Sequence, residues 1–209
     1  GSELNIRTLQ SKRQKKVSET TADRIALLRK AKTLPDLIAN RAKTAPDDEA
    51  LRQYDRSKGE WVSTTFGELQ ERILEWHKAY AALKLERGSR VGILLPNGID
   101  AVCADQGALA NALVPVPMHA IDTAGASAFI LIDSQASVLV TNKLSRWQAI
   151  ADTGIILPDL RHVILTEETS VPAPEGEIEL HTLSDWLKMG EPLTEADLTE
   201  KPEPDDLGA

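Results

Sequence analysis

The spacing of apolar residues changes along this chain, and each change predicts a different element. Apolar positions recur at helical spacing in residues 20–32 and again after Thr33-Leu34-Pro35. Thr33 is placed to cap the second helix, and Pro35 falls in its first turn. Two short runs with strand character follow, 50–54 and 61–65, and a polar turn joins them. This pattern predicts two helices and then a β-hairpin.

A long amphipathic helix is predicted to start after Thr65. The run Thr65-Phe66-Gly67-Glu68 has the spacing of a capping box, in which the Thr side chain accepts from the amide three residues on and the Glu reaches back. We expect the helix to run to about Leu85. Gly88 is placed to close it, because glycine accepts the left-handed conformation. Its apolar stripe consists of Leu69, Ile73, Trp76, Tyr80 and Leu83.

From residue 90 onward, short apolar strands alternate with helices. Strands are predicted at 90–95, 113–117, 137–141 and 161–165, and helices at 99–111, at 122–133 and through Leu144, Trp147 and Ile150. The apolar residues expected to define the helix at 122–133 are Phe129, Ile130 and Ile132. This alternation indicates βαβ units, so the predicted fold is α/β, with a parallel sheet that carries helices on both faces.

The rhythm is lost after residue 166. A short helix near 184–189 is expected among segments rich in Pro, Glu and Asp, and the interpretation is a surface connection. Gly1-Ser2 resembles the remnant of a cleaved tag. The predicted organisation is therefore a tag remnant, basic arm and helix at 1–32, the hairpin and α/β sheet at 33–166, and an acidic connecting segment at 167–209.

The charge is divided unevenly. Residues 1–43 hold 11 Lys/Arg and 4 Asp/Glu, a net +7, and the rest of the chain holds a net −15, which together give −8. A basic arm can touch anionic lipid or a partner, so at most peripheral membrane contact is expected, and an adaptor working through this arm is one hypothesis. The acidic body argues against nucleic acid. No apolar run approaches the roughly 20 residues of a membrane span, and no secretion signal is visible, so we expect a cytoplasmic protein.

Candidate chemistry is sparse. Neither a glycine-rich phosphate loop nor a nucleophile elbow occurs. The single cysteine, Cys103, lies in an apolar helical pattern and is interpreted as a small buried hydrophobe. The histidines are scattered, with no cysteine or carboxylate at ligand spacing, so no metal site is predicted. They are His77, His119, His162 and His181. No residue is assigned as catalytic or cofactor-binding.

One pair of residues is a candidate for contact with a substrate. Met118 and His119 directly follow the predicted strand 113–117. Ligands of open parallel sheets lie at the carboxyl ends of the strands, so His119 would face a ligand if this strand is central. The alternative is an ordinary loop histidine.

Four segments in order carry a family resemblance. Residues 64–69 (Thr-Thr-Phe-Gly-Glu-Leu) and 88–97 (Gly-Ser-Arg-Val-Gly-Ile-Leu-Leu-Pro-Asn) resemble the early motifs of the AMP-forming acyl-CoA synthetases. Residues 107–117 and 129–139 resemble the two motifs that follow. These enzymes belong to the adenylate-forming superfamily, with firefly luciferase and the adenylation domains of peptide synthetases. The resemblance covers about residues 33–209.

The resemblance implies part of the larger N-terminal domain of such an enzyme. The parent would use ATP, Mg²⁺ and coenzyme A to convert a carboxylic acid, here a fatty acid, into its thioester. The end of the chain, Asp206-Leu207-Gly208-Ala209, resembles the family's lead-in to its phosphate loop. The chain alone is therefore expected to bind no cofactor and to be inactive, and to self-associate through an open sheet edge.

Departures from the family pattern leave the substrate open. Ser89 stands where Asp is common, Asn111 and Ala112 where Gly is usual, and Met118-His119 replaces the usual continuation. Both an acyl-CoA ligase and an acyl-AMP ligase fit the resemblance. The alternative to the synthetase hypothesis is a stand-alone flavodoxin-like binding or regulatory domain, because the same alternation of strands and helices is typical of that fold.

Overall fold

The computed structural model describes residues 34–174 and 176–198. The predicted helix at 20–32 and the cap at Thr33 lie outside these residues. The helices are α2 (Leu34–Thr44), α3 (Phe66–Ala82), α4 (Ile99–Ala110), α5 (Ala124–Asp133), α6 (Leu144–Ala151) and α7 (Leu183–Gly190), and a 3-10 turn follows at η1 (Glu195–Asp197). The strands are β1 (Glu49–Asp55), β2 (Glu60–Thr65), β3 (Arg90–Leu94), β4 (Val114–Pro117), β5 (Val138–Thr141), β6 (His162–Leu165) and β7 (Glu179–Thr182).

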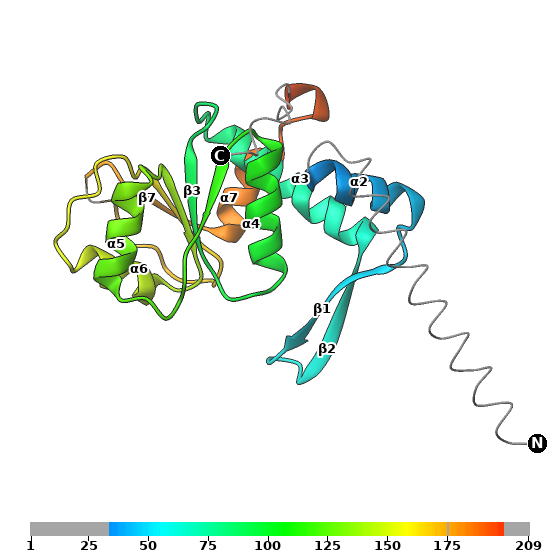
Figure 1. The fold of residues 1–209 in the computed structure, drawn as a ribbon, viewed down its shortest axis with the longest axis horizontal. Helices are drawn as coiled ribbons and strands as arrows, with labels where there is room; N and C mark the ends of the chain where they lie inside the picture. The colour runs from blue at the N-terminus through cyan, green and yellow to red at the C-terminus, as the bar shows by residue number, and fades with distance from the viewer. Residues whose placement is uncertain (1–33, 175, 199–209) are drawn as a thin grey trace, which may run out of the picture.

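The predicted parallel sheet with helices on both faces is confirmed, and it has five strands, one more than predicted (Figure 1). Its strand order is β4-β3-β5-β6-β7. Residues from α3, α4 and α7 pack on one face, and residues from α5 and α6 pack on the other. Each layer has its own apolar cluster, because alternate residues of a buried strand point to opposite faces of the sheet.

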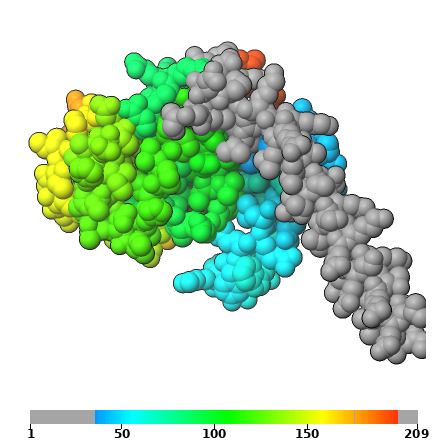
Figure 2. All heavy atoms as spheres, in the orientation of Figure 1, coloured from blue at the N-terminus to red at the C-terminus, as the bar shows by residue number. Residues whose placement is uncertain are grey.

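The N-terminal hairpin is confirmed. Strands β1 and β2 pair antiparallel, from Glu49 opposite Thr65 to Asp55 opposite Glu60. The hairpin projects from the body of the molecule, below it in Figure 2. Helix α3 begins directly after β2 with the predicted capping box, in which Thr65 Oγ1 accepts from the Glu68 amide and the Glu68 carboxylate accepts from the Thr65 amide.

Helix α3 ends earlier than predicted. It stops at Ala82 rather than near Leu85. The amides of Leu83 and Lys84 donate to the carbonyls of Tyr80 and Ala81, which tightens the last turn. Lys84 then takes the left-handed conformation, with φ of 54°, so the helix has already closed before Gly88 is reached.

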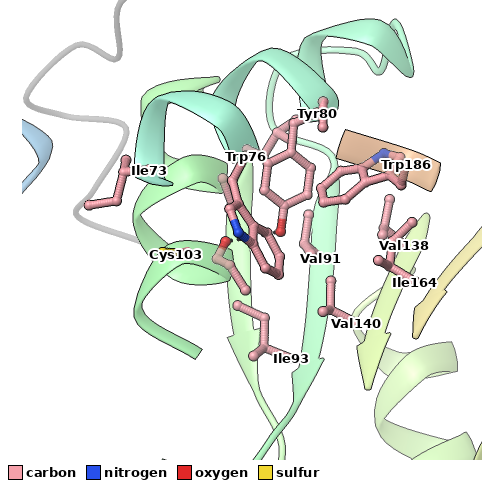
Figure 3. Close-up of a cluster of buried hydrophobic side chains, with 14 of the residues drawn as sticks. Ile73, Trp76, Tyr80, Val91, Ile93, Cys103, Val138, Val140, Ile164 and Trp186 are labelled. Carbon is pink, nitrogen blue, oxygen red and sulfur yellow. Dashed lines mark hydrogen bonds between the residues drawn. The ribbon is translucent and has the colours of Figure 1, made fainter. Parts of the chain in front are cut away.

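The larger apolar cluster joins α3, α4 and α7 to the sheet. Figure 3 shows Trp76 and Tyr80 of α3 meeting Trp186 of α7 above the valines and isoleucines of β3, β5 and β6. The ring of Trp186 stands edge-on to both partners, with centroid distances of 5.4 Å to Trp76 and 4.9 Å to Tyr80. Edge-to-face rings of this kind add to the stabilisation from buried area.

The interpretation of the segment after residue 166 as surface connection is wrong over 179–190. Strand β7 was not predicted, and it extends the sheet by pairing parallel to β6. The predicted helix near 184–189 exists as α7, and its Trp186 is completely buried. This part of the chain therefore belongs to the core. The predicted division of the chain into segments with boundaries at residues 32 and 166 otherwise stays a prediction.

The second cluster shows which apolar residues of the two predicted helices face the sheet. In α5 these are Ala128 and Leu131, both buried, whereas Phe129 is 65% exposed. In α6, Trp147 and Ile150 are buried.

Candidate functional site

The strand order identifies the place where a ligand would bind. The chain leaves β3 towards β4 on one side and returns to β5 on the other side of β3, so the connections diverge between β3 and β5. Numbered within the sheet, the order is 2-1-3-4-5, that of flavodoxin-like folds. In open α/β sheets, ligands occupy the crevice at the carboxyl ends of the strands where such a divergence occurs. We therefore take this edge as the candidate site.

A hollow of about 200 Å³ lies at this edge. Its wall combines the end of β3 and the start of α4 with residues that follow β5 and β6, and one side chain comes from the hairpin. The lining residues are Gln53, Leu95, Pro96, Asn97, Gly98, Ile99, Asp100, Asn142, Thr166 and Glu167. The hollow is small for a cofactor-sized ligand, for which pockets hold roughly 300–1,000 Å³.

Gln53 connects the hairpin to this edge. Its Oε1 accepts from the Ile99 amide at 2.9 Å, which satisfies a free N–H in the first turn of α4. Gly98, the residue before that helix, has no side chain to cap it. A Cβ at residue 98 would lie 2.7 Å from Gln53 Oε1, so a side chain there would displace the Gln53 amide from its bond to Ile99. The hairpin and the carboxyl edge thus hold each other in place.

The charges in the hollow are negative. Asp100 and Glu167 are the ionisable residues of the lining, and neither Lys nor Arg lines it. Burial raises the pKa of Asp100, and the nearby Arg72 opposes that rise. Two carboxylates without a cation do not fit the phosphates of ATP, which need cationic side chains and backbone amides around them. This hollow alone is therefore not a nucleotide phosphate site.

Met118 and His119 lie elsewhere on the same edge of the sheet. They follow β4, which is the outer strand next to β3 rather than a central strand. Met118 is buried against the α5 side of the sheet, and a Cβ on Gly92 would lie 3.0 Å from its sulfur. His119 is exposed. Neither residue lines the hollow, so their proximity to a substrate stays a prediction.

The interpretation of the histidines as scattered is wrong for two of them. His162 Nδ1 lies 3.2 Å from His181 Nε2, and Glu179 Oε2 lies 4.0 Å and 3.7 Å from these two nitrogens. The sequence signal was the pair Glu179 and His181, two residues apart on what proved to be a strand, which puts both on one face. His77 stands apart from this group, and burial lowers its pKa to about 4.

Cys103 is buried in α4, as predicted. Burial, and to a smaller extent the charge of Asp100, raises the pKa of its thiol to about 12. A thiol with this pKa is not ionised near neutral pH, so Cys103 is neither a nucleophile nor a ready metal ligand.

A larger groove of about 610 Å³ lies at the other end of the sheet. It is bounded by the end of α6, the segments that precede β6 and β7, and part of the long connection between these strands. That connection contains no helix in its described residues, which leaves this part of the α6 face open. The groove lies at the amino ends of the strands and is therefore not the expected ligand position.

Comparisons with known proteins identify a family. A family model described as AMP-binding enzyme matches residues 38–208. Among curated proteins, long chain acyl-CoA synthetase 1 of Arabidopsis thaliana is 27% identical over 171 residues, covering 74% of this chain and 24% of the relative. The chain thus spans about a quarter of the length of the curated relative it matches.

Solved structures share the fold. A fatty acyl CoA synthetase of Mycobacterium tuberculosis has a TM-score of 0.58 and 21% identity, covering 75% of this chain and 28% of that one. An anthranilate CoA ligase solved with anthranoyl-AMP has a TM-score of 0.63 and 20% identity, covering 81% of this chain and 29% of that one. Over the described part of the chain, the helices are too short or too polar for any of them to cross a membrane.

Proposed function

Because this chain belongs to the AMP-binding enzyme family, we propose that it is the N-terminal part of an ATP-dependent acyl-CoA synthetase. In the first step, the substrate carboxylate attacks the α-phosphorus of ATP, and pyrophosphate leaves as acyl-AMP forms. In the second step, the coenzyme A thiolate attacks the acyl carbon and AMP leaves. The observation that carries this proposal is the family match over residues 38–208. A curated protein similar to this chain is a long chain acyl-CoA synthetase, which supports a fatty acid as the substrate.

We propose that the chain alone does not catalyse adenylation. The first step brings an anionic carboxylate to a polyanion, so Mg²⁺ and cationic donors must surround the developing charge. Loss of a single such donor typically costs about 2.7–4 kcal/mol of transition-state stabilisation. The described carboxyl edge offers Asp100 and Glu167 instead of cations. The role of this part is structural: it supplies the sheet and the helices against which the remainder of the enzyme packs. We expect the enzyme to act in the cytoplasm.

The experiment compares residues 1–209 with the protein encoded by the complete reading frame. Each is incubated with ATP, Mg²⁺ and fatty acids of graded length, with and without coenzyme A, and pyrophosphate and thioester are measured. We expect the longer protein to release pyrophosphate and form the thioester, and the 209-residue chain to do neither. Pyrophosphate released by the short chain would contradict its inactivity. Acyl-AMP formed without thioester would identify an acyl-AMP ligase.

A second candidate is a stand-alone flavodoxin-like binding domain, which shares this strand order, whereas the family match favours the synthetase. The reading frame separates the two. A stop codon directly after Ala209 would favour the binding domain, and continuation into a loop rich in Ser, Thr and Gly would favour the synthetase.

The position of His119 after β4 supports a contact with the acyl substrate. We expect His119→Ala in the full enzyme to raise KM for the fatty acid and leave KM for ATP unchanged. Met118 is not suitable for this test, because it is buried in the second apolar cluster and its truncation would also destabilise the fold. A change in KM for both substrates, or for neither, would contradict the assignment.

We propose that self-association of the isolated chain proceeds through β7 rather than β4. The Val114 amide donates to the Ser89 carbonyl just before β3, and the Met118 amide donates to the Ile93 carbonyl in β3. Alternation along β4 therefore turns the nitrogens of Pro115 and Pro117 to the outer side. Proline has no N–H, so these two positions of the β4 edge offer no donor to another strand, which makes it the poorer edge for pairing. Among the described residues β7 pairs only with β6, which leaves its other side available. Sedimentation that shows a monomer at high protein concentration would contradict this proposal.

A further inference from the structure

A compact group of ligating side chains lies at the amino ends of the two last strands, away from the candidate site. His162 is the first residue of β6, and it pairs in register with Glu179, the first residue of β7. His181 follows two residues later on the same face of β7. Ile164, two residues after His162, belongs to the cluster under α3, α4 and α7, so the group faces that side of the sheet.

The spacing of the three side chains matches that of metal ligands. Two imidazole nitrogens that bind one Zn²⁺ at about 2.0–2.1 Å in a tetrahedral arrangement lie about 3.3 Å apart. Here Nδ1 of His162 and Nε2 of His181 are 3.2 Å apart. The Glu179 carboxylate oxygen is 3.7 Å from the His181 nitrogen and 4.0 Å from that of His162. All three ligand atoms lie within 4.8 Å of one another.

The three ligating side chains differ in burial. The imidazoles are largely covered, with 17% and 13% of their side-chain surface exposed, whereas the Glu179 side chain is 61% exposed. Two fixed nitrogens and one movable carboxylate allow the last ligand to close on an entering ion.

We propose that His162, Glu179 and His181 form a binding site for a divalent transition-metal ion of the zinc class. Imidazole and carboxylate are the ligand types that suit such an ion, and three protein ligands leave a fourth position for water. Since the ligands come from adjacent strands, the bound ion joins the outer strand β7 to β6. The ion therefore stabilises the outer edge of the sheet, where β7 pairs only with β6 among the described residues.

The rest of the chain offers little competition for such an ion. The chain has four histidines and one cysteine, and all five lie among the described residues. Cys103 is buried and its thiol is protonated near neutral pH. Among the described residues, this is the only group of three or more His, Cys, Asp or Glu side chains close enough to share a metal ion. Binding can therefore be assigned by substituting single histidines.

The experiment titrates the metal-free 209-residue chain with Zn²⁺ by calorimetry and with Co²⁺ by visible absorption. We expect one ion per chain. Loss of a residue that only hydrogen-bonds to a metal ligand typically weakens metal binding 10- to 100-fold. His162→Gln and His181→Gln remove a ligand itself, so each should weaken Zn²⁺ binding by at least that factor. The matched control is His119→Gln, an exposed histidine outside the group, and it should bind as the parent does. Zn²⁺ should raise the melting temperature of the parent and the control but not of the two variants.

A second measurement avoids substitutions. Diethyl pyrocarbonate modifies accessible histidines, and mass spectrometry locates the adducts. Zn²⁺ should protect His162 and His181 and leave modification of His119 unchanged. Absence of Zn²⁺ binding, or binding that survives both His162→Gln and His181→Gln, would overturn the proposal. The two imidazoles would then form only an N–H···N hydrogen bond between the strands.

Discussion

Replacing Trp186 by alanine tests whether α7 is part of the core. The side chain is completely buried, and its ring meets those of Trp76 and Tyr80 edge-on. Truncating a buried tryptophan to alanine typically costs about 3–5 kcal/mol, because a cavity remains. One contribution opposes this loss. The indole Nε1 has no hydrogen-bond partner among the described residues, and removing an unpaired buried donor recovers about 1–3 kcal/mol. We expect a net decrease of about 2 kcal/mol in the free energy of unfolding, the difference between the mid-values of the two contributions.

The assay is urea unfolding followed by far-UV circular dichroism. Trp61→Ala is the matched control, because Trp61 is 65% exposed and contacts only the ring of Tyr54 among the described aromatic side chains, at 5.5 Å. Its truncation should cost no more than about 1 kcal/mol. Trp186→Phe keeps an aromatic ring and removes the unpaired N–H, so it should cost less than Trp186→Ala. A Trp186→Ala loss within about 0.5 kcal/mol, the range of surface substitutions, would refute the placement of α7 in the core.

Four further outcomes follow from individual contacts. Gly190→Ala should destabilise the chain by about 1–3 kcal/mol through overpacking, because its Cβ would lie 2.5 Å from the Ala79 nitrogen; Gly125→Ala, whose Cβ would lie no closer than 4.0 Å to its nearest neighbour, Thr123 Oγ1, is the control in the same urea assay. Thr65→Ala should remove the capping box and cost about 1 kcal/mol, and Thr65→Ser should restore most of it; equal losses would argue against the cap. Cys103 should react with a thiol reagent only after unfolding, since its thiol is buried and has a pKa of about 12; rapid reaction of the native chain would contradict this. Burial lowers the pKa of His77 to about 4, so between pH 6.5 and 4 the unfolded chain binds more protons and stability falls as the pH falls; His77→Gln should reduce that fall in urea melts at pH 7 and pH 5.

The parts of the fold that could be predicted are those with a strong local signal. The hairpin, the capping box at Thr65 and the strands β3, β4, β5 and β6 follow from runs of apolar residues between turn residues. Strand β7 was missed although Ile178 and Leu180 alternate with Glu179 and His181. Its four residues lie among prolines and acidic residues, and only pairing with β6 makes the alternation meaningful.

The sites are less visible because they depend on strand register. His162 and His181 are 19 residues apart in the chain, and only the parallel pairing of β6 with β7 brings their nitrogens to 3.2 Å. No local pattern encodes that register. Exposure of Phe129 has a similar origin: the α5 sequence is apolar on most sides, so the sequence alone does not say which residues face the sheet.

The arrangement at the carboxyl edge fits a part of a larger active site better than a complete one. The strand order creates a divergence between β3 and β5, and Gln53 fixes the first turn of α4 beside it. The hollow that results is small, and its ionisable lining residues, Asp100 and Glu167, are both acidic. A nucleotide placed against this wall alone would meet negative charge and no cation. The acidic wall therefore agrees with the proposal that this chain alone does not catalyse adenylation.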